Sequence, residues 1–260
     1  MTIMSATYSV AGTLNREPST TASGRPPVWG LLATLIWFQV AAVVSLVAGV
    51  ACLLSFLLWS SIAPPDVALK LDSPALGYLC YAMATTGFGF VLAHAARLTG
   101  WSARDYFGLV LPKLRYIPIG FGALFAYAIF VGLMTSLFPW FDQSTTMIQE
   151  YREAADNVTG LLLFWFVFVA VAPVIEELAF RGFMFRGFSE SRLGFGGTIL
   201  LTSLIWASFH LRYNVAVMTQ VFCGGLLFGI IRWRSGSTAL TILLHATWNL
   251  VCVVRLALLV

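Results

Sequence analysis

The sequence predicts an all-α integral membrane protein with about seven transmembrane helices, and two observations lead to this prediction. First, 59% of the 260 residues are hydrophobic and only 10% are charged, with a mean hydropathy of +0.87, whereas an ordinary soluble domain has about 25% charged residues. Second, apolar runs of about 20 residues, long enough to cross a bilayer, recur along the chain. The net charge of +4 is small and dispersed, so we expect no nucleic-acid partner.

The first part of the chain is predicted to be a tail followed by two spans. Residues 1–27 are rich in Ser and Thr and lack the features of a signal peptide, so we expect a disordered cytoplasmic tail. The apolar run Val28–Ile62 exceeds the length of one span and indicates either one tilted or protruding helix or a span followed by an interfacial piece. A second span, Leu76–Leu98, precedes an aromatic and basic stretch at 99–115 that is typical of a segment at the membrane surface. Residues 28–115 form the predicted N-terminal part.

Residues 116–260 are predicted to form a second part with five further helices. An acidic loop at Asp142–Asp156 precedes the fourth span, which continues past Arg186 as a projecting, amphipathic extension and ends at a glycine-marked turn. In the sixth span, Gly225 and Gly229 stand four residues apart, a spacing that allows a close helix contact. The predicted spans are Tyr116–Phe138, a helix beginning near Thr159, Thr198–Leu211, Val215–Arg232 and Ser237–Leu259.

The positions of the lysines and arginines favour a cytoplasmic N-terminus. Cytoplasmic loops carry an excess of these residues, and the seven-span arrangement places eleven of them on the N-terminal side against four on the other. The eleven are Arg16, Arg25, Arg97, Arg104, Lys113, Arg115, Arg181, Arg186, Arg192, Arg232 and Arg234, and the four are Lys70, Arg152, Arg212 and Arg255.

Two adjacent glutamates interrupt the fourth span. Glu176 and Glu177 follow a long, almost wholly apolar run, and an ionised group inside a bilayer costs several kcal/mol unless it is paired. Arg181 follows Glu177 by four residues, so the two side chains share a helix face and can form an ion pair. Glu176 points about 100° away and has no such partner. We therefore interpret Glu177 as structural and Glu176 as available for chemistry.

Two histidines in later spans are predicted to lie near these glutamates. Glu176 and His210 are each seventeen residues from a turn at Leu193, and therefore at similar depth. Polar residues also recur at helical spacing along the last span and should line a cavity, because lipid cannot satisfy them. This polar stripe comprises Thr238, Thr241, His245, Asn249 and Cys252. We expect a water-accessible chamber, open to the cytoplasmic side, between the fourth, fifth and seventh helices.

These side chains suit two kinds of hydrolytic site. A glutamate beside a histidine can take a proton from attacking water while two further donors hold the developing oxyanion. Alternatively, Glu176, His210 and His245 could hold a divalent metal such as zinc. The spacing does not decide between them, since the chain has no His-Glu-x-x-His motif. A serine elbow and a phosphate loop are also missing, and the four cysteines lie in apolar runs without an activating neighbour.

Three short motifs resemble the signature of the CPBP intramembrane proteases, the family that includes the Rce1-like CAAX prenyl endopeptidases and the Abi proteins of bacteria. They lie within residues 160–250, in the family's order and each on a predicted span. Trp206 stands where the family usually has Phe. The motifs are Glu176-Glu177-x-x-x-Arg181, Trp206-x-x-x-His210 and His245-x-x-x-Asn249.

The resemblance implies a peptidase, with residues 116–260 as its catalytic membrane domain, that acts on a peptide or protein substrate in a bacterial-type plasma membrane. The family is labelled a metalloprotease, but the resemblance also implies a glutamate-dependent mechanism without a tightly bound metal, which we favour; a divalent metal such as zinc stays open. In the implied mechanism Glu176 and His210 activate water, His245 and Asn249 bind the oxyanion, and Glu177, Arg181 and Trp206 support the site. Two other functions stay open: a non-catalytic immunity or scaffold protein of the same family, and a small-solute transporter. The sequence indicates neither the oligomeric state nor whether a substrate is prenylated.

Overall fold

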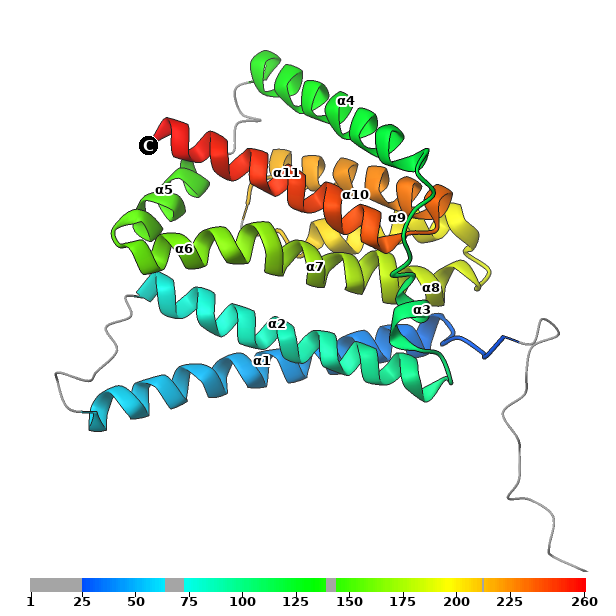
Figure 1. Cartoon of the computed structure of the whole chain (residues 1–260), viewed down its shortest axis with the longest axis horizontal. Coiled ribbons are helices and arrows are strands. Elements are labelled where there is room, and N and C mark those ends of the chain that lie inside the picture. Colours follow the sequence, from blue (N-terminus) through cyan, green and yellow to red (C-terminus); the bar gives the residue numbers. More distant parts are fainter. Residues whose placement is uncertain (1–24, 64–72, 139–143, 212) are drawn as a thin grey trace, which may run out of the picture.

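The computed structural model describes residues 25–63, 73–138, 144–211 and 213–260, and all regular structure in these ranges is helical (Figure 1). The predicted disordered tail therefore lies almost wholly outside the described residues. Within them, six helices are long and apolar enough to cross a membrane, which confirms an all-α, multi-pass membrane protein. The predicted fifth span is a shorter helix, Gly194–Ser208, so the count of seven is approximate.

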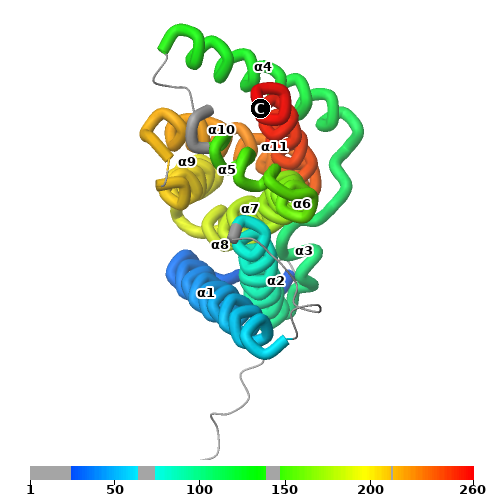
Figure 2. The backbone as a smooth tube through the Cα atoms, turned by 90° about the vertical axis from the view of Figure 1, so that its left-hand side faces the viewer, coloured from blue at the N-terminus to red at the C-terminus, as the bar shows by residue number. Residues whose placement is uncertain are grey.

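The helices form three tiers, which Figure 2 shows from the side. An antiparallel pair, α1 and α2, lies against a central group of helices from α6 to α11, and α4 crosses the opposite face. The elements are α1 (Leu31–Ile62), α2 (Ser73–Leu98), α3 (Ala103–Phe107), α4 (Tyr116–Leu137), α5 (Ser144–Ala155), α6 (Val158–Phe166), α7 (Ala172–Glu177), α8 (Phe185–Ser189), α9 (Gly194–Ser208), α10 (Val215–Ser235) and α11 (Thr238–Leu259).

The glutamates lie on a continuous helix that runs from Val158 to Ser189 and comprises α6, α7 and α8. Asn157 begins it by accepting a hydrogen bond from the Gly160 amide at 2.8 Å. Two π-helical segments, Val167–Val171 and Leu178–Met184, flank α7. Such wider turns free backbone groups from the regular ladder and are frequent at functional sites.

The freed backbone of the second π-helical segment is bonded to neighbouring helices. The Arg181 carbonyl accepts hydrogen bonds from Arg232 Nε at 2.9 Å and from Thr238 Oγ1 at 3.3 Å. Gly236, with φ of +71°, turns the chain between the two donors, a conformation that favours glycine. The α10–α11 hairpin is therefore fixed directly to the turn that carries Arg181.

Three segments differ from the prediction. The stretch 99–115 is not simply a surface segment, because Tyr106 and Phe107 are buried against Phe183, and Arg186 donates hydrogen bonds to the backbone of α3. The extension of the fourth span is not amphipathic, since α1, α3 and α9 pack around it. The described part of the predicted acidic loop is helix α5, with Tyr151 packed on Phe164.

The predicted close contact at Gly225 and Gly229 is confirmed, and its partner is α9. A Cβ atom at position 225 would lie 2.8 Å from Ser203 Cβ, and one at position 229 would lie 2.9 Å from Ile199 Cγ2. Glycine lets the two backbones approach within a distance that any side chain would prevent. This contact sets the position of α10 beside the glutamate-bearing helix.

Replacing Gly225 by Ala is expected to lower the free energy of unfolding by about 1–3 kcal/mol, because the added methyl group pushes α10 away from α9. The measurement is SDS titration of the purified protein in detergent micelles. The control is Gly122→Ala on the exposed face of α4, where no atom lies within 4 Å of the new Cβ. At that site the intrinsic helix preference for Ala should be neutral or stabilising by up to about 1 kcal/mol. Equal effects at both positions would contradict the packing argument.

Candidate active site

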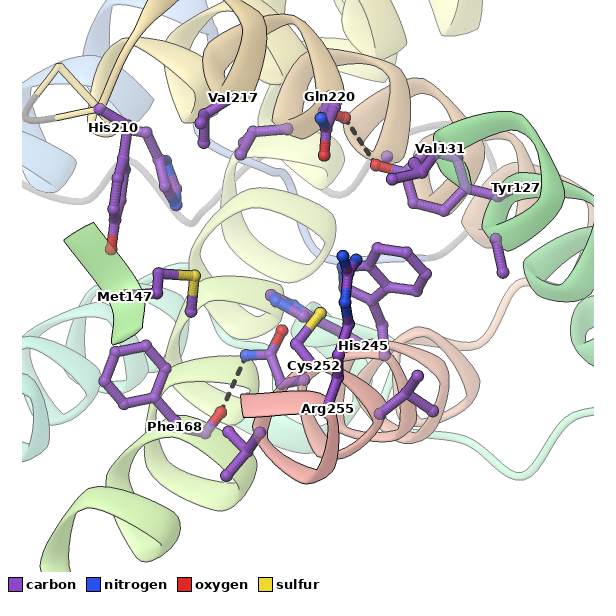
Figure 3. Close-up of a pocket in the computed structure, with 18 of the residues that line it drawn as sticks. Tyr127, Val131, Met147, Phe168, His210, Val217, Gln220, His245, Cys252 and Arg255 are labelled. Carbon is purple, nitrogen blue, oxygen red and sulfur yellow. Dashed lines mark hydrogen bonds between the residues drawn. The ribbon is translucent and has the colours of Figure 1, made fainter. Parts of the chain in front are cut away.

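A cavity of about 330 Å³ lies among α4, α7, α10 and α11, and Figure 3 shows the side chains that line it. Its lining includes all four residues to which the sequence assigned chemistry: Glu176, His210, His245 and Asn249. The structure therefore brings groups from three separate motifs to one space. Helices α4 and α10 also form walls that the sequence did not predict.

The predicted pair of Glu177 and Arg181 is present and completely buried. Arg181 Nη1 lies 3.0 Å from Glu177 Oε1, and neither side chain is exposed. His245 Nδ1 lies 3.1 Å from the same carboxylate oxygen. One carboxylate oxygen thus receives both the guanidinium of the first motif and the imidazole of the third motif.

Arg181 makes further contacts that compensate its burial. Its Nη2 donates to the Gly225 carbonyl at 3.2 Å, and its Cζ lies 4.3 Å from the centre of the Trp206 ring. Guanidinium groups are attracted to aromatic faces, most strongly to that of Trp. Among the described residues, only Arg181 Nε and Glu177 Oε2 are buried side-chain atoms without a hydrogen-bond partner.

Trp206 links Glu176 to His210. The indole Nε1 donates to Glu176 Oε2 at 2.6 Å, and His210 Nδ1 lies 3.0 Å from the Trp206 carbonyl oxygen. The ring centre of Trp206 is 5.7 Å from that of His210 and 5.3 Å from that of His245. Glu176 and His210 therefore share a neighbour, and no direct hydrogen bond between them is present in the described part of the chain.

The hydrogen bonds of the two imidazoles determine which nitrogen is available. A carbonyl or carboxylate oxygen only accepts, so Nδ1 of His210 and Nδ1 of His245 each carry the proton in these bonds. This assignment follows from the partners and not from visible hydrogens. Nε2 of each ring is left for a ligand in the cavity.

Asn249 is positioned by the first π-helical segment. Its Nδ2 donates to the Phe168 carbonyl at 2.8 Å (Figure 3), which leaves a second N–H and the side-chain oxygen for other partners. Phe168 lies within Val167–Val171, where the widened turn exposes a carbonyl. A departure from regular helix thus orients the Asn of the third motif.

Three of the five residues of the predicted polar stripe on α11 line the cavity. Thr238 and Thr241 are completely buried, and their hydroxyls donate to the carbonyls of Phe107 and Thr238. The cavity is lined instead by His245, Asn249 and Cys252. Threonine satisfies its hydroxyl on nearby backbone more readily than a longer polar side chain can, so its presence in a span is a weaker sign of a cavity.

The zinc alternative requires three ligands that converge on one point. Among the described residues, no three His, Cys, Asp or Glu side chains form a group that could hold a metal ion. Glu176 is instead bonded to Trp206, and His245 to Glu177. The suggested ligand set of Glu176, His210 and His245 does not fit this arrangement.

The cavity extends from the middle of the bundle toward one end. Its lining runs from Glu176 and Phe228 to Thr135, Tyr213 and Leu259, which lie near helix ends. The sequence analysis assigned eleven lysines and arginines to the N-terminal side of the membrane. Those that the structure describes lie toward the other end of the bundle, beside the start of α4, the turn after α8 and the α10–α11 turn (Figure 1). The cavity therefore extends toward the end of the bundle opposite these basic residues.

Sequence reasoning missed two hydrogen bonds of the site. It did not foresee that Glu177 binds His245, or that Trp206 binds Glu176. The second bond had a signal, because an indole N–H inside a membrane must find an acceptor. No sequence signal predicted the bond between Glu177 and His245, because that bond depends on how α11 is rotated against α7.

Replacing Arg181 by Met should lower the free energy of unfolding by about 3–5 kcal/mol, because Glu177 would remain buried without its cation. Glu190→Gln is the comparison, since it removes the half-exposed pair with Arg186 at 3.7 Å and should cost less than about 1 kcal/mol. SDS titration in micelles measures both. The double variant Glu177→Gln with Arg181→Met should recover much of the loss. If it recovers none, lost packing rather than an unpaired charge explains the effect.

Comparisons with known proteins agree with the motifs. Residues 158–251 match the family model described as type II CAAX prenyl endopeptidase Rce1-like. An "Uncharacterized 24.3 kDa protein" of Escherichia coli is 31% identical over 96 residues, which cover 35% of this chain and 43% of that protein. The "UPF0177 protein YbdI" of Lactococcus lactis is 36% identical over 80 residues, which cover 27% of this chain and 44% of that protein.

The matched region is the part of the chain that forms the cavity wall from α6 to α11. The chain spans less than half the length of both curated relatives, and no solved structure matches it. The region carries the Glu-Glu-x-x-x-Arg, Trp-x-x-x-His and His-x-x-x-Asn motifs, which meet at one cavity. Residues 158–251 are therefore similar to the Rce1-like family of type II CAAX prenyl endopeptidases, in agreement with the resemblance of the three motifs.

Proposed function

We propose that this protein is an intramembrane endopeptidase that hydrolyses a peptide bond with water activated by Glu176 and His210. The observation that supports this best is the convergence of the three motifs on one cavity in a bundle of membrane-spanning helices. The similarity of residues 158–251 to a family of endopeptidases also supports this proposal. The mechanism uses side chains of this chain alone.

Glu176 is the base in this mechanism. Its Oε2 is occupied by Trp206 Nε1, so Oε1 can accept a proton from a water molecule in the cavity. His210, held through Nδ1, can bind the same water through Nε2. Glu176 and His210 are both hydrogen-bonded to Trp206, which is almost fully buried. The two side chains are therefore held in position before the substrate arrives.

His245 and Asn249 are the donors for the oxyanion. As water attacks the carbonyl carbon, negative charge develops on the carbonyl oxygen, and hydrogen-bond donors at that point lower the barrier. His245 presents Nε2 because Glu177 holds Nδ1, and Asn249 presents its second N–H because Phe168 holds the first. Each donor is oriented by a partner outside the reaction path.

The oxyanion needs a hydrogen-bond donor at Nε2 of His245. Nδ1 of this ring already donates to Glu177 Oε1, so the proposed mechanism uses the imidazole with a proton on both nitrogens.

The proton removed from water completes the reaction. The tetrahedral intermediate collapses by breaking the bond between carbon and nitrogen, and the amine leaves with the proton that Glu176 accepted. Glu176 returns to its ionised form, and no covalent bond to the protein forms. Hydrolysis therefore needs only substrate and one water molecule.

Glu176→Gln is expected to lower the rate of peptide cleavage at least about 100-fold, because the amide cannot accept the proton from water. His210→Ala should act in the same direction. Both variants are reconstituted into liposomes with a pool of synthetic membrane-anchored peptides, and fragments are measured by mass spectrometry. A chelator added to the wild type should leave its rate unchanged.

The matched control is Glu153→Gln, which removes a carboxylate from the exposed face of α5 outside the cavity. It should cleave at the wild-type rate. If Glu176→Gln retained wild-type activity in cells, a non-catalytic immunity or scaffold role would be supported instead.

We also propose that the basic end of the bundle faces the cytoplasm, as the eleven-to-four distribution of lysines and arginines indicates. A fluorescent protein fused before α1 should then be fluorescent in bacteria. Alkaline phosphatase fused after α11 should be active, because α11 ends at the opposite end from the start of α1 (Figure 1). If the fusion before α1 were not fluorescent and the phosphatase after α11 were inactive, the end of the bundle toward which the cavity extends would face the cytoplasm.

A further inference from the structure

Arg255 is a charged residue of the cavity that the mechanism does not use. It lies on α11, ten residues beyond His245, and lines the same cavity as Glu176. Figure 3 shows its side chain extending from α11 toward α10, where Gln220 reaches in from the opposite wall. Among the described lining residues Arg255 is the one Lys or Arg, and Glu176 is the one acid.

In the described part of the chain, Arg255 makes no ion pair with an acidic side chain and no hydrogen bond. The acid of the cavity, Glu176, is already bonded to Trp206. Arg255 is exposed, and the lining residues on the same part of α11 include Val251, Cys252, Leu256 and Leu259. A guanidinium pairs most strongly with an anion that binds two of its nitrogens.

The distance along α11 relates Arg255 to the reaction site. Ten residues of helix rise about 15 Å, and long helical side chains lean toward the N-terminus, in this case toward His245. An extended peptide advances about 3.3 Å per residue. The space between the oxyanion donors and the guanidinium therefore suits a short stretch of extended peptide.

We propose that Arg255 binds a carboxylate of the substrate, carried by the peptide within a few residues of the bond that is cleaved. This inference rests on the proposed function. The carboxylate is either the C-terminal group of the peptide or an Asp or Glu side chain, and Arg255 pairs with both oxygens. It thereby selects the substrate and sets its position along the cavity.

The test measures binding to the Glu176→Gln protein in nanodiscs, so that cleavage does not interfere. Short synthetic peptides without Asp or Glu are supplied as free acids and as C-terminal amides, and a third set has an amide end and one internal Asp. Retained peptides are quantified by mass spectrometry. We expect the acid or the Asp set to be retained about 10- to 100-fold better than the neutral set. The set that is preferred identifies the source of the carboxylate.

Adding Arg255→Gln should reduce this preference to about one, while retention of the neutral amides stays the same. The matched control, Arg234→Gln, removes an exposed arginine at the other end of the bundle, where it lies beside Trp233. It should keep the full preference. Equal retention of all three sets, or a preference that survives Arg255→Gln, would overturn the proposal.

Anionic lipid is the other partner that an arginine near a helix end could bind. If Arg255→Gln leaves peptide selection intact and instead removes co-purified phosphatidylglycerol, Arg255 binds a lipid headgroup and the proposal is wrong. Because retention is measured on an inactive protein, this result is independent of whether the wild type cleaves peptides. Loss of cleavage with intact acid selection would contradict the proposed function alone.

Discussion

The central part of the bundle depends on a pair of charges that lipid cannot solvate. Glu177 and Arg181 are both fully buried, and each must find partners from other helices. Gly225 of α10 supplies a carbonyl to Arg181, and its lack of a side chain lets α10 lie close to α9. His245 meets the same carboxylate oxygen from α11. The burial of one ion pair thus fixes three helices in one arrangement.

The same arrangement explains why regular helix gives way on both sides of α7. Pro173 has no backbone N–H, so the ladder is already interrupted there. The first π-helical segment offers the Phe168 carbonyl to Asn249, and the second offers the Arg181 carbonyl to Arg232. Each wider turn therefore joins the glutamate-bearing helix to another part of the cavity wall. The irregular turns position the side chains that the proposed reaction uses.

Much of this fold could be predicted from the sequence, because the bilayer leaves few alternatives for long apolar segments. Hydrophobic length located the spans, and the four-residue spacing of Glu177 and Arg181 gave their pair. Helical periodicity could not show that Phe183 and Phe188 would be buried, since that depends on α1, α3 and α9 packing around them. Counting residues from the turn at Leu193 predicted that Glu176 and His210 lie at similar depth. It could not predict that Trp206 lies between them, because that depends on the rotation of each helix about its axis.

Trp206 makes contact with groups from all three motifs. It donates to Glu176, its carbonyl accepts from His210, and its ring lies against Arg181 and His245. A phenylalanine there would keep the ring but lose the N–H. Substitutions at Trp206 and at any of these neighbours should therefore show large interaction energies rather than independent effects. In this lineage the residues of the cavity are expected to have changed together, with position 206 restricting which combinations survive.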